Sequence, residues 1–333
     1  MNILVLGGTV FLGRHIVNSA LRNNHNVTLF NRGVTNPDLY PDVEKLKGDR
    51  NGNLDSLRKR KFDAVIDISG YLPSIVRNSV EFLKDKVEHY TYISSVSVYK
   101  SNLEKFKNEN SELNIIDIES GEKINNESYG ALKALCEKKV QEVYKENCLI
   151  LRSGLIVGED DPYDRFTYWV DRIKKGGTIL LPDDKNGNLQ FIDVKDISEW
   201  IVKMVEDLER GVYNVTGPDY KLTLENFIWK CITVIGDPNN INLEWANVYF
   251  LIGENKVLPY QDIPLWRLNG FNQLNHIDFK KALAKGLKIR PVEETIIDSN
   301  NFASRRKNHI LKAGLSSVRE KELLGKWIEK NIK

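Results

Sequence analysis

Tyr129 and Lys133 are the residues of this sequence with the clearest capacity for chemistry. They stand four positions apart in a segment with a helical pattern, so their side chains become neighbours on one face of the predicted helix. A free tyrosine has a pKa of about 10 and is a poor base at neutral pH. A nearby ammonium favours the phenolate and lowers that pKa. We therefore expect Tyr129 to exchange a proton with a substrate hydroxyl as a general acid or base.

A third polar group is available in the segment Ser94-Ser95-Val96-Ser97, which ends a predicted strand at 90–94. A serine hydroxyl at that strand end can hydrogen-bond the reacting oxygen. The Tyr-x-x-x-Lys spacing alone is weak evidence, because both residue types are common in helices and an ordinary exposed pair is the alternative. The strand-borne serines and a glycine turn near the N-terminus together disfavour that alternative.

The glycine turn contains Gly7, Gly8 and Gly13, between the apolar run 3–6 and a helical pattern at 11–23. Gly7 suits a tight turn, Gly8 leaves the backbone bare for a pyrophosphate, and Gly13 allows close packing of helix on strand. The N-terminus of that helix offers N–H groups and a positive dipole end to phosphates. The turn predicts a dinucleotide site, and a tight connection without a ligand is the alternative.

Near-continuous apolar runs alternate with helical patterns through the first half of the chain. The expected strands are 3–6, 27–30, 43–46, 64–68, 90–94 and 149–152, and the expected helices are 11–23, 54–60, 75–84 and 129–145. Such alternation is typical of an α/β protein with a doubly wound parallel Rossmann sheet. Ligands of this fold bind at the carboxyl ends of the strands.

The pattern is less regular after residue 152 and becomes mainly helical. The expected helices are 164–175, 197–208, 223–235, 279–285 and 317–332, and the expected short strands are 190–194, 212–215 and 241–245. We expect residues 1–155 with about 188–217 to form the nucleotide-binding domain. Residues of about 156–187 with 218–333 would form a smaller, mostly helical substrate-binding domain. The polar segment 100–128 is either a lid over the site or a disordered surface insertion.

Composition narrows the class of protein. The 333 residues are 41% hydrophobic and 28% charged, with a net charge of +2, which is ordinary for a globular protein. Three cysteines without CxxC spacing and five scattered histidines predict neither a disulfide framework nor a metal site. No apolar run approaches the ~18 residues of a membrane span, and a strand at the very N-terminus leaves no room for a signal peptide. We expect a reducing, cytoplasmic compartment and no membrane partner.

Positive charge gathers in the segment 280–333, which carries 14 Lys/Arg and 6 Asp/Glu. This segment could face an anionic ligand or a nucleic acid. A solvated helix surface is the more common cause of such a bias, and we do not expect nucleic acid to be the main partner.

Taken together, the motifs resemble the short-chain dehydrogenase/reductase superfamily, in its extended or atypical branch of NAD(P)-dependent epimerase/dehydratases. The matching segments, within residues 1–217, are Gly7-Gly8-Thr9-x-x-x-Gly13, Ser94-Ser95-x-x-Val98-Tyr99, Tyr129-x-x-x-Lys133, Arg152-x-Gly154-x-x-x-Gly158 and Phe191-Ile192-Asp193-Val194-x-Asp196. The resemblance implies that Ser95 is the catalytic serine and Tyr129 the acid/base. It also implies that Lys133 binds the nicotinamide ribose, and that a homodimer can form.

The nucleotide cofactor is expected to be NADP, with NAD as the alternative. The second strand ends without the acidic residue that would hold the ribose 2′-OH of NAD, whereas Arg32 can pair with a 2′-phosphate and Asn31 can donate to it. By resemblance, Asp49 lies near the adenine. The other expected cofactor contacts, besides the glycines, Tyr129 and Lys133, are Thr9, Phe11, Leu12, Ser69, Gly70 and Ser94.

Substrate contacts are expected from Arg165, which could bind an anionic group such as a diphosphate, and from Gln190. Two departures from the resemblance concern the reaction. Val10 stands where the extended branch usually has a further glycine. Val96-Ser97 stands where sugar-nucleotide dehydratases usually carry Asp-Glu, which disfavours a 4,6-dehydratase.

The sequence therefore predicts an NADP-dependent epimerase or ketoreductase. It would transfer hydride at a secondary alcohol or ketone of a sugar-nucleotide-like or other polar small molecule. The alternative is a non-catalytic, nucleotide-sensing or RNA-binding protein of the same fold.

Overall fold

The computed structural model describes residues 1–100, 106–116, 122–268, 276–306 and 310–332. These residues divide into two compact units. The first unit comprises Met1–Ile156, Val194–Gly217 and His276–Lys288, and the second comprises Val157–Asp193, Pro218–Asn275 and Ile289–Lys333. The strand β7 (Ile156–Val157) lies at the division.

The division differs from the expected one at two places. Residues 188–193 belong to the second unit, and His276–Lys288 belongs to the first. The latter segment carries α7 (Lys280–Ala284), which packs on β11 (Gly211–Val215). In addition, the Asn214 side-chain amide donates to the Asp278 carbonyl oxygen at 2.9 Å. Contacts between residues so distant in the chain leave no local signal in the sequence.

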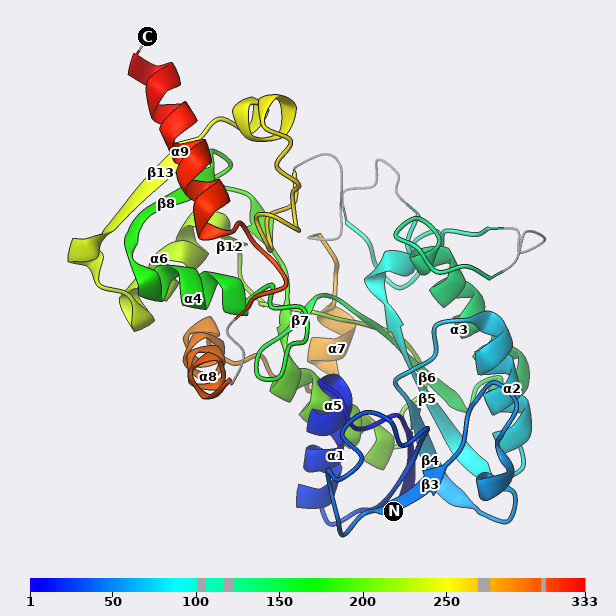
Figure 1. Ribbon diagram of the computed structural model, residues 1–333. Coiled ribbons are helices and arrows are strands. Elements are labelled where there is room, and N and C mark those ends of the chain that lie inside the picture. Colours follow the sequence, from blue (N-terminus) through cyan, green and yellow to red (C-terminus); the bar gives the residue numbers. More distant parts are fainter. Residues whose placement is uncertain (101–105, 117–121, 269–275, 307–309, 333) are drawn as a thin grey trace. The chain divides into compact units, whose positions relative to one another are not determined.

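A seven-stranded sheet forms the centre of the first unit, in the order β11-β6-β5-β4-β1-β2-β3 (Figure 1). Its other strands are β1 (Asn2–Leu6), β2 (Asn26–Asn31), β3 (Glu44–Lys47), β4 (Phe62–Asp67), β5 (Val87–Ser95) and β6 (Cys148–Ser153). Every neighbouring pair is parallel. The chain runs outward from β1 through β2 to β3 and then returns with β4 on the other side of β1. The crevice at this reversal is where doubly wound folds bind ligands, so the expected fold class is confirmed.

Helices cover both faces of this sheet (Figure 1). One face carries α1 (Leu12–Arg22) and α5 (Val194–Glu206), which pack against each other, and the other carries α2 (Pro73–Leu83) and α3 (Tyr129–Tyr144), which do the same. Short 3-10 turns, η1 (Asp55–Leu57) and η2 (Val96–Val98), complete the unit. Because both faces are covered, the central strands β1, β4, β5 and β6 are buried along most of their length.

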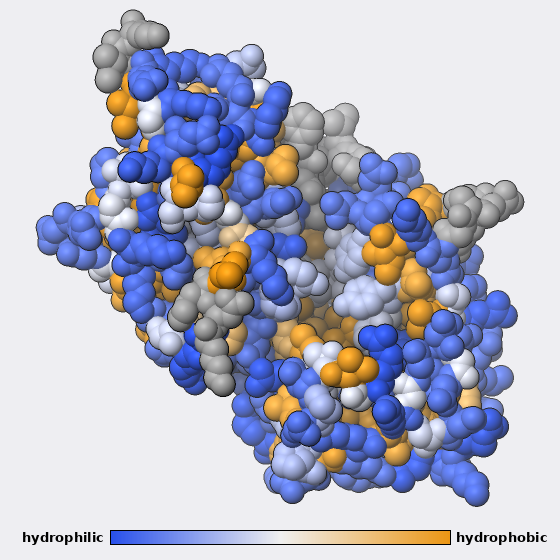
Figure 2. All heavy atoms as spheres, viewed as in Figure 1, coloured by the Kyte–Doolittle hydropathy of each residue, from blue (hydrophilic) through white to orange (hydrophobic). Residues whose placement is uncertain are grey.

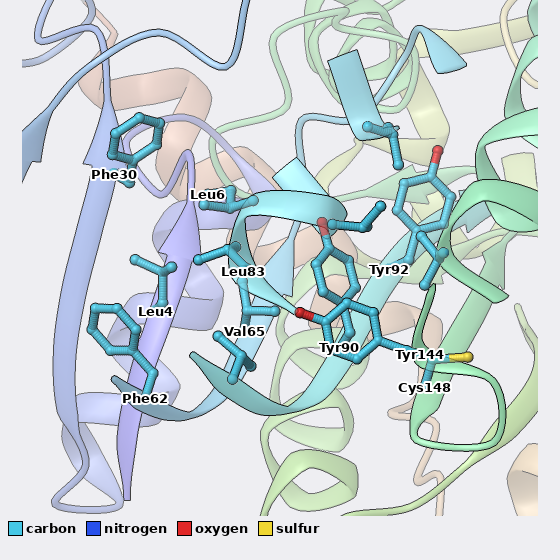
Figure 3. Close-up of a cluster of buried hydrophobic side chains, with 14 of the residues drawn as sticks. Leu4, Leu6, Phe30, Phe62, Val65, Leu83, Tyr90, Tyr92, Tyr144 and Cys148 are labelled. Carbon is cyan, nitrogen blue, oxygen red and sulfur yellow. The ribbon is translucent and has the colours of Figure 1, made fainter. Parts of the chain in front are cut away.

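The core beneath α2 and α3 shows how one strand serves both faces (Figure 3). Leu4 and Leu6 of β1 belong to this cluster, whereas the alternate residues Ile3 and Val5 are equally buried and point to the opposite face, because successive strand side chains alternate. The other labelled members are Phe30, Phe62, Val65, Leu83, Tyr90, Tyr92, Tyr144 and Cys148.

The glycine turn requires its glycines for two separate reasons. Gly8 has a φ of +95°, and a Cβ there would lie 2.8 Å from Leu29 Cδ2. A Cβ on Gly13 would lie 2.9 Å from the Gly8 Cα, a contact with backbone that cannot move aside. Gly13 therefore brings the first turn of α1 directly against the turn that follows β1.

One expected element of the first unit differs from the structure. The predicted helix 54–60 is only the turn η1, in which Leu57 is buried. The run Arg58-Lys59-Arg60-Lys61 places four like charges together, which opposes a longer helix. In the segment 100–128, residues 101–105 and 117–121 lie outside the described part. The remaining residues include bridges from Leu113 to Tyr99 and from Lys107 to Ile277, which anchor this stretch to the first unit.

The second unit is mainly helical, as expected, with α4 (Thr167–Lys175), α6 (Leu224–Ile235), α8 (Val292–Arg305), α9 (Ser317–Ile332), the 3-10 turn η3 (Pro238–Asn240) and the π-helix η4 (Phe250–Glu254). Its strands are β8 (Gly177–Pro182), β9 (Asn188–Leu189), β10 (Ile192–Asp193), β12 (Leu222–Thr223) and β13 (Ile241–Ala246). Neither β8 nor α8 was expected. β8 begins after Gly176 and ends on Pro182, and it is stabilised by its parallel partner β13, 64 positions later at their first pair, Ile241 and Gly177.

The expected strand 190–194 is shorter in the structure, where β10 covers only Ile192–Asp193 and Val194 begins α5.

On the face drawn in Figure 2, hydrophilic residues predominate and hydrophobic ones form small scattered groups. Within the described ranges, no helix combines the length and the apolar character that crossing a bilayer requires. The three cysteines are buried and carry free thiols.

Gly13→Ala should destabilise the protein by about 1–3 kcal/mol, because the added methyl overpacks against the Gly8 backbone. Gly325→Ala is the matched control, since Gly325 also lies within a helix and a Cβ placed on it would have no other atom within 4 Å. The control should stabilise by about 0.5–1 kcal/mol through helix propensity alone. Urea unfolding measures both, and equal effects of the two substitutions would contradict the packing argument.

Candidate active site

The carboxyl ends of five strands bring the expected cofactor residues to one edge of the sheet. Gly7 follows β1, Asn31 ends β2, Asp49 follows β3, Ser69 follows β4 and Ser95 ends β5. Because all these strands are parallel neighbours, the residues that follow them share one edge. The site is therefore assembled from loops that are up to 88 positions apart in the chain.

The N-terminus of α1 suits a phosphate group. Phe11, the residue that caps it, makes no side-chain hydrogen bond to the helix, and the first turn holds no acidic residue. Phe11 has a φ of +35°, a strained value for a bulky residue. An N-terminus without a side-chain acceptor or a negative charge leaves its dipole available to an anion, so the residues present fit a dinucleotide pyrophosphate.

Asn31 connects the end of β2 to the glycine turn. Its side-chain amide donates to the Gly7 carbonyl oxygen at 3.2 Å, and its Oδ1 accepts the Gly33 N–H at 2.9 Å. Arg32 is exposed, as is Asp49, whose carboxylate accepts the Asn51 N–H. The guanidinium of Arg32 and the carboxylate of Asp49 thus both lie at the surface of this edge.

Lys133 is buried in the sheet edge, with 2% of its surface exposed. Its ammonium donates to the Gly70 carbonyl oxygen at 2.8 Å and to the Ile93 carbonyl oxygen at 2.6 Å. The Nζ atom also lies 4.2 Å from the centroid of the Tyr92 ring and 5.5 Å from that of the Tyr71 ring. Burial lowers the pKa of Lys133 from 10.5 to about 8, while neighbouring negative groups partly oppose the shift.

The backbone segments that carry Ser95 and Tyr129 pack closely against each other. The Ser95 hydroxyl accepts the Ser97 N–H at 3.2 Å and so caps η2. Gly130, the residue after Tyr129, lies so close to η2 that a Cβ on it would fall 1.9 Å from the Ser97 carbonyl oxygen. The first turn of α3 therefore rests on the segment that carries Ser95. Lys133, one turn later, reaches back to Ile93 of the same strand.

A buried charge network that the sequence did not predict lies next to Lys133. Glu137 lies one turn after Lys133 on α3. Its carboxylate accepts hydrogen bonds from the Nε and Nη2 atoms of Arg152 on β6, and the Nη2 distance is 2.8 Å. The Ser94 hydroxyl donates to the same carboxylate, so this expected cofactor residue is committed to the network through its side chain. Arg152 also donates to the Tyr99 hydroxyl at 3.1 Å. A charged residue inside an apolar strand run was the available signal.

A second unforeseen network lies under the β4 end of the edge. Arg50 pairs with Asp67 through two hydrogen bonds of 2.7 and 2.6 Å, and both side chains are buried. The Tyr90 hydroxyl donates to the Asp67 carboxylate at 2.7 Å. Ser69, an expected cofactor contact, donates its hydroxyl to the Leu6 carbonyl oxygen at 3.2 Å. Asp67 interrupts the apolar run 64–68, which again was the signal.

The expected substrate residues Arg165 and Gln190 belong to the second unit. The Arg165 guanidinium lies 4.6 Å from the centroid of the Tyr260 ring, and the Arg267 guanidinium lies 3.9 Å from the same centroid. Burial, together with the charge of Arg165, lowers the pKa of Arg267. Across the described part of the chain, no carboxylate forms an ion pair with either guanidinium. We call these residues, Arg165, Tyr260 and Arg267, the arginine–tyrosine cluster.

Asp161 lies close enough to Arg165 for the two charges to interact. Burial raises the pKa of Asp161 to about 6, and its Oδ2 atom has no hydrogen-bond partner among the described residues. Gln190 lies half-buried between β9 and β10. In the same described ranges, no group of three or more His, Cys, Asp or Glu side chains is placed to hold a metal ion.

Comparisons with known proteins agree with this architecture. Among solved structures, the chain is similar to UDP-glucose 4-epimerase from Thermotoga maritima, with a TM-score of 0.66 at 15% identity over 92% of this chain and 99% of the other. The enzyme WbmH of Bordetella bronchiseptica, solved with NAD+, gives a TM-score of 0.67 at 14% identity over 93% and 99%. At these identities the likeness shows a shared fold.

A curated relative is more similar in sequence. The chloroplast stem-loop binding protein of 41 kDa b from Arabidopsis thaliana is 27% identical over 279 residues, which cover 78% of this chain and 70% of the relative.

A family model, described as the NAD dependent epimerase/dehydratase family, matches residues 3–216. The match spans the whole sheet, the glycine turn, Ser95, Tyr129 and Lys133, so the resemblance drawn from the motifs is confirmed. The enzyme class, an NAD(P)-dependent oxidoreductase or epimerase of the short-chain dehydrogenase/reductase type, is confirmed at the level of the family. From its fold, its motifs and this match, we conclude that the chain belongs to the NAD dependent epimerase/dehydratase family.

Proposed function

We propose that this protein is an NADP-dependent epimerase or ketoreductase, acting at a secondary alcohol or ketone of a sugar-nucleotide-like small molecule. The observation that carries the proposal is the placement of Lys133. Its ammonium is held between the Gly70 and Ile93 carbonyl oxygens, at the sheet edge that also carries Ser95 and the first turn of α3. Burying an ammonium costs free energy, and charged groups buried in this way are concentrated at functional sites.

The residues of the site have separate tasks under this proposal. A bound nicotinamide would accept or return hydride at the substrate carbon. Tyr129 takes the proton from the substrate hydroxyl, or returns it, as the general acid/base. Lys133 keeps its proton at neutral pH, since its pKa is about 8, and its positive charge favours the Tyr129 phenolate. Ser95 donates a hydrogen bond to the reacting oxygen, because its hydroxyl accepts but does not donate within η2.

The cofactor preference rests on the end of β2. The structural neighbour WbmH was solved with NAD+, and likeness of fold leaves the choice between NAD and NADP to the residues of this chain. The exposed Arg32 guanidinium, with no acidic residue at the end of β2, favours a 2′-phosphate. NADP is therefore the cofactor we propose, with NAD as the alternative.

The arginine–tyrosine cluster supports a substrate with an anionic group. Two guanidiniums share the ring of Tyr260 without a paired carboxylate among the described residues. Like charges so close together repel, and a bound phosphate would neutralise them through charge-assisted hydrogen bonds. A diphosphate, with two anionic groups, matches a pair of guanidiniums and fits a sugar nucleotide.

Within this substrate class, epimerisation or ketone reduction is favoured over dehydration. Val96 and Ser97 occupy η2 directly after Ser95, and Val96 is buried. Neither can act as the acid and base that elimination of water needs. The three free, buried cysteines are consistent with the reducing, cytoplasmic compartment that we propose for this enzyme.

A second candidate function is RNA binding. The Arabidopsis relative is, by its name, a stem-loop binding protein, and the segment 280–333 is basic. Binding of this kind would weaken steeply with salt and would be indifferent to the loss of one phenol. The retention of Ser95, Tyr129 and Lys133 together favours the enzyme.

Tyr129→Phe should reduce turnover at least ~100-fold, because it removes only the proton that the acid/base exchanges. The change keeps the ring, so the affinity for NADPH, measured by fluorescence titration, should stay within about twofold. Turnover is measured with NADP and a panel of sugar nucleotides. Tyr99→Phe is the control, because the Tyr99 hydroxyl is bound in the buried network by Asn214 and Arg152. Undiminished turnover in the Tyr129 variant would exclude it as the acid/base.

Arg32→Ala should weaken NADP binding by about 10- to 100-fold, because it removes a charge-assisted contact to the 2′-phosphate. Binding of NAD, which lacks that phosphate, should change little. Calorimetric titration of the wild type and the variant with both dinucleotides provides the comparison. Equal losses for NADP and NAD would contradict the cofactor preference.

Arg165→Gln and Arg267→Gln should each weaken binding of inorganic pyrophosphate and of UDP by about tenfold or more. Arg319→Gln is the control in the same unit, since Arg319 is already paired with Glu322. Thermal shifts at fixed ligand concentration report the affinities. Similar shifts in all three variants and the wild type would show that the arginine–tyrosine cluster does not bind the anion.

A further inference from the structure

The buried ion pair of Arg50 and Asp67 forms further hydrogen bonds with the side chains and backbone around it. Besides its two bonds to Asp67, the Arg50 guanidinium donates through Nε to the Ser79 hydroxyl of α2 at 2.8 Å and through Nη1 to the Ser69 hydroxyl at 3.3 Å. The Asp67 carboxylate also accepts the Ser69 N–H at 3.2 Å and the Tyr90 hydroxyl at 2.7 Å. A buried pair of this kind seldom adds net stability compared with apolar residues of similar size. Its presence next to the candidate site therefore calls for another explanation.

The contacts of the pair lead directly to Lys133. Ser69, which both members of the pair contact, precedes Gly70, and the Gly70 carbonyl oxygen accepts the Lys133 ammonium and the Tyr92 hydroxyl, each at 2.8 Å. Gly70 is closely packed, because a Cβ there would lie 2.7 Å from the side chains of Tyr92 and Val76 and 3.2 Å from the Asp67 Oδ2. The Arg50–Asp67 pair therefore packs directly against the two-residue segment, Ser69 and Gly70, that supplies the carbonyl oxygen to Lys133.

We propose that Arg50 and Asp67 are positioning residues of the active site, which fix the Gly70 carbonyl under the Lys133 ammonium and keep the local charge beside that ammonium balanced. The purpose of this arrangement depends on the proposed function, because a lysine that must stay protonated is stabilised by a fixed acceptor and by neutral surroundings. The experiment below does not depend on that function. The pair acts through Lys133, because both of its side chains are buried.

The charge balance follows from the groups around Lys133. The titratable or charged groups that act on it are Cys136 and Glu137 from α3, Asp67 from β4, Tyr71 from the loop after β4, Tyr92 from β5, and Arg50 from the turn after β3. Burial is the main cause that lowers the pKa of Lys133, the charge of Asp67 raises it, and that of Arg50 lowers it. The Glu137 charge is matched by Arg152. Removing one member of the Arg50–Asp67 pair should therefore move the Lys133 pKa in a direction set by which member is lost.

The test measures the Lys133 pKa directly, by NMR titration of protein carrying ¹³C at the lysine Cε, with Lys133→Arg to assign the signal. Asp67→Asn keeps the shape of the side chain and leaves Arg50 uncompensated, so it should lower the pKa by about one unit. Arg50→Gln leaves Asp67 uncompensated and should raise the pKa by a similar amount. The double variant is neutral again and should titrate near the wild type.

Two controls separate charge from packing. Ser79→Ala removes the Nε bond of Arg50 and keeps both charges, so the Lys133 pKa should not move. Arg50→Lys keeps the positive charge and should also leave the pKa near the wild-type value, and it stays informative if Arg50→Gln fails to fold. Shifts of the same sign in Asp67→Asn and Arg50→Gln would overturn the proposal, as would an unmoved pKa in Asp67→Asn.

The failure of this inference can be distinguished from the failure of the proposed function. The NMR titration needs no ligand and reports on the pair alone. Fluorescence titration with NADPH reports on the enzyme, and in the wild type its affinity should fall as the pH rises above about 8, when Lys133 loses its proton. In Asp67→Asn this fall should move to lower pH together with the NMR midpoint. Opposite NMR shifts without any NADPH binding would support the positioning role of the pair and contradict the proposed function. NADPH binding without NMR shifts would contradict the positioning role and support the proposed function.

Discussion

An ammonium held inside the protein is the constraint on which the rest of this structure depends. Lys133 is almost fully buried, and its charge is stabilised by two backbone carbonyl oxygens, Gly70 and Ile93, that come from adjacent parallel strands or the loops after them. Burying a charge costs several kcal/mol unless the surroundings compensate it. The arrangement works only if β4, β5 and α3 keep their mutual positions, so the chemistry of one side chain depends on the packing of half of the sheet.

The packing supplies that rigidity in two ways. Apolar residues such as Leu4, Val65 and Tyr90 fill the core beneath α2 and α3 (Figure 3), and glycines at 8, 13 and 130 allow backbone contacts that any side chain would prevent. The two buried charge pairs, Arg50 with Asp67 and Arg152 with Glu137, then connect the strands to the helices next to the site. Each pair lies one layer behind the residues expected to do the chemistry. Buried pairs are specific in geometry even where they add little stability.

The second unit has a different electrostatic character. The arginine–tyrosine cluster holds two guanidiniums that form no ion pair with a carboxylate of the described residues, and Asp161, whose charge interacts with that of Arg165, is a buried acid with a raised pKa. Uncompensated charge of this kind is costly in the absence of a ligand, and it is typical of sites where an anion completes the structure. Under the proposed function, the first unit would supply the groups that move a proton, and the second would supply groups that bind an anion.

Much of the fold and of the candidate site could be predicted from the sequence, because the hydrophobic pattern and residue spacing of a short segment indicate its local structure. The alternation of apolar runs with helical patterns determined the parallel sheet, the glycines at 7, 8 and 13 determined the turn after β1, and the four-residue spacing of Tyr129 and Lys133 placed them on one helical face. Local patterns do not report pairing between distant segments. The strand β8, which was not expected, depends on β13, and the helix expected at 279–285 belongs to the first unit because it packs on β11.

The buried charges show the same limit most clearly. Asp67 and Arg152 were visible as charged residues in apolar runs, but a charge in such a run is compatible with an exposed strand end, an error of register or a buried pair. Only the tertiary structure decided among these, because the partners Arg50 and Glu137 lie 17 and 15 positions away on other elements. The sequence by itself determined which residue types are available for the proposed chemistry. The fold decided which charges stay inside to hold that chemistry in place, since the free energy of a buried charge depends on the partners that folding brings to it.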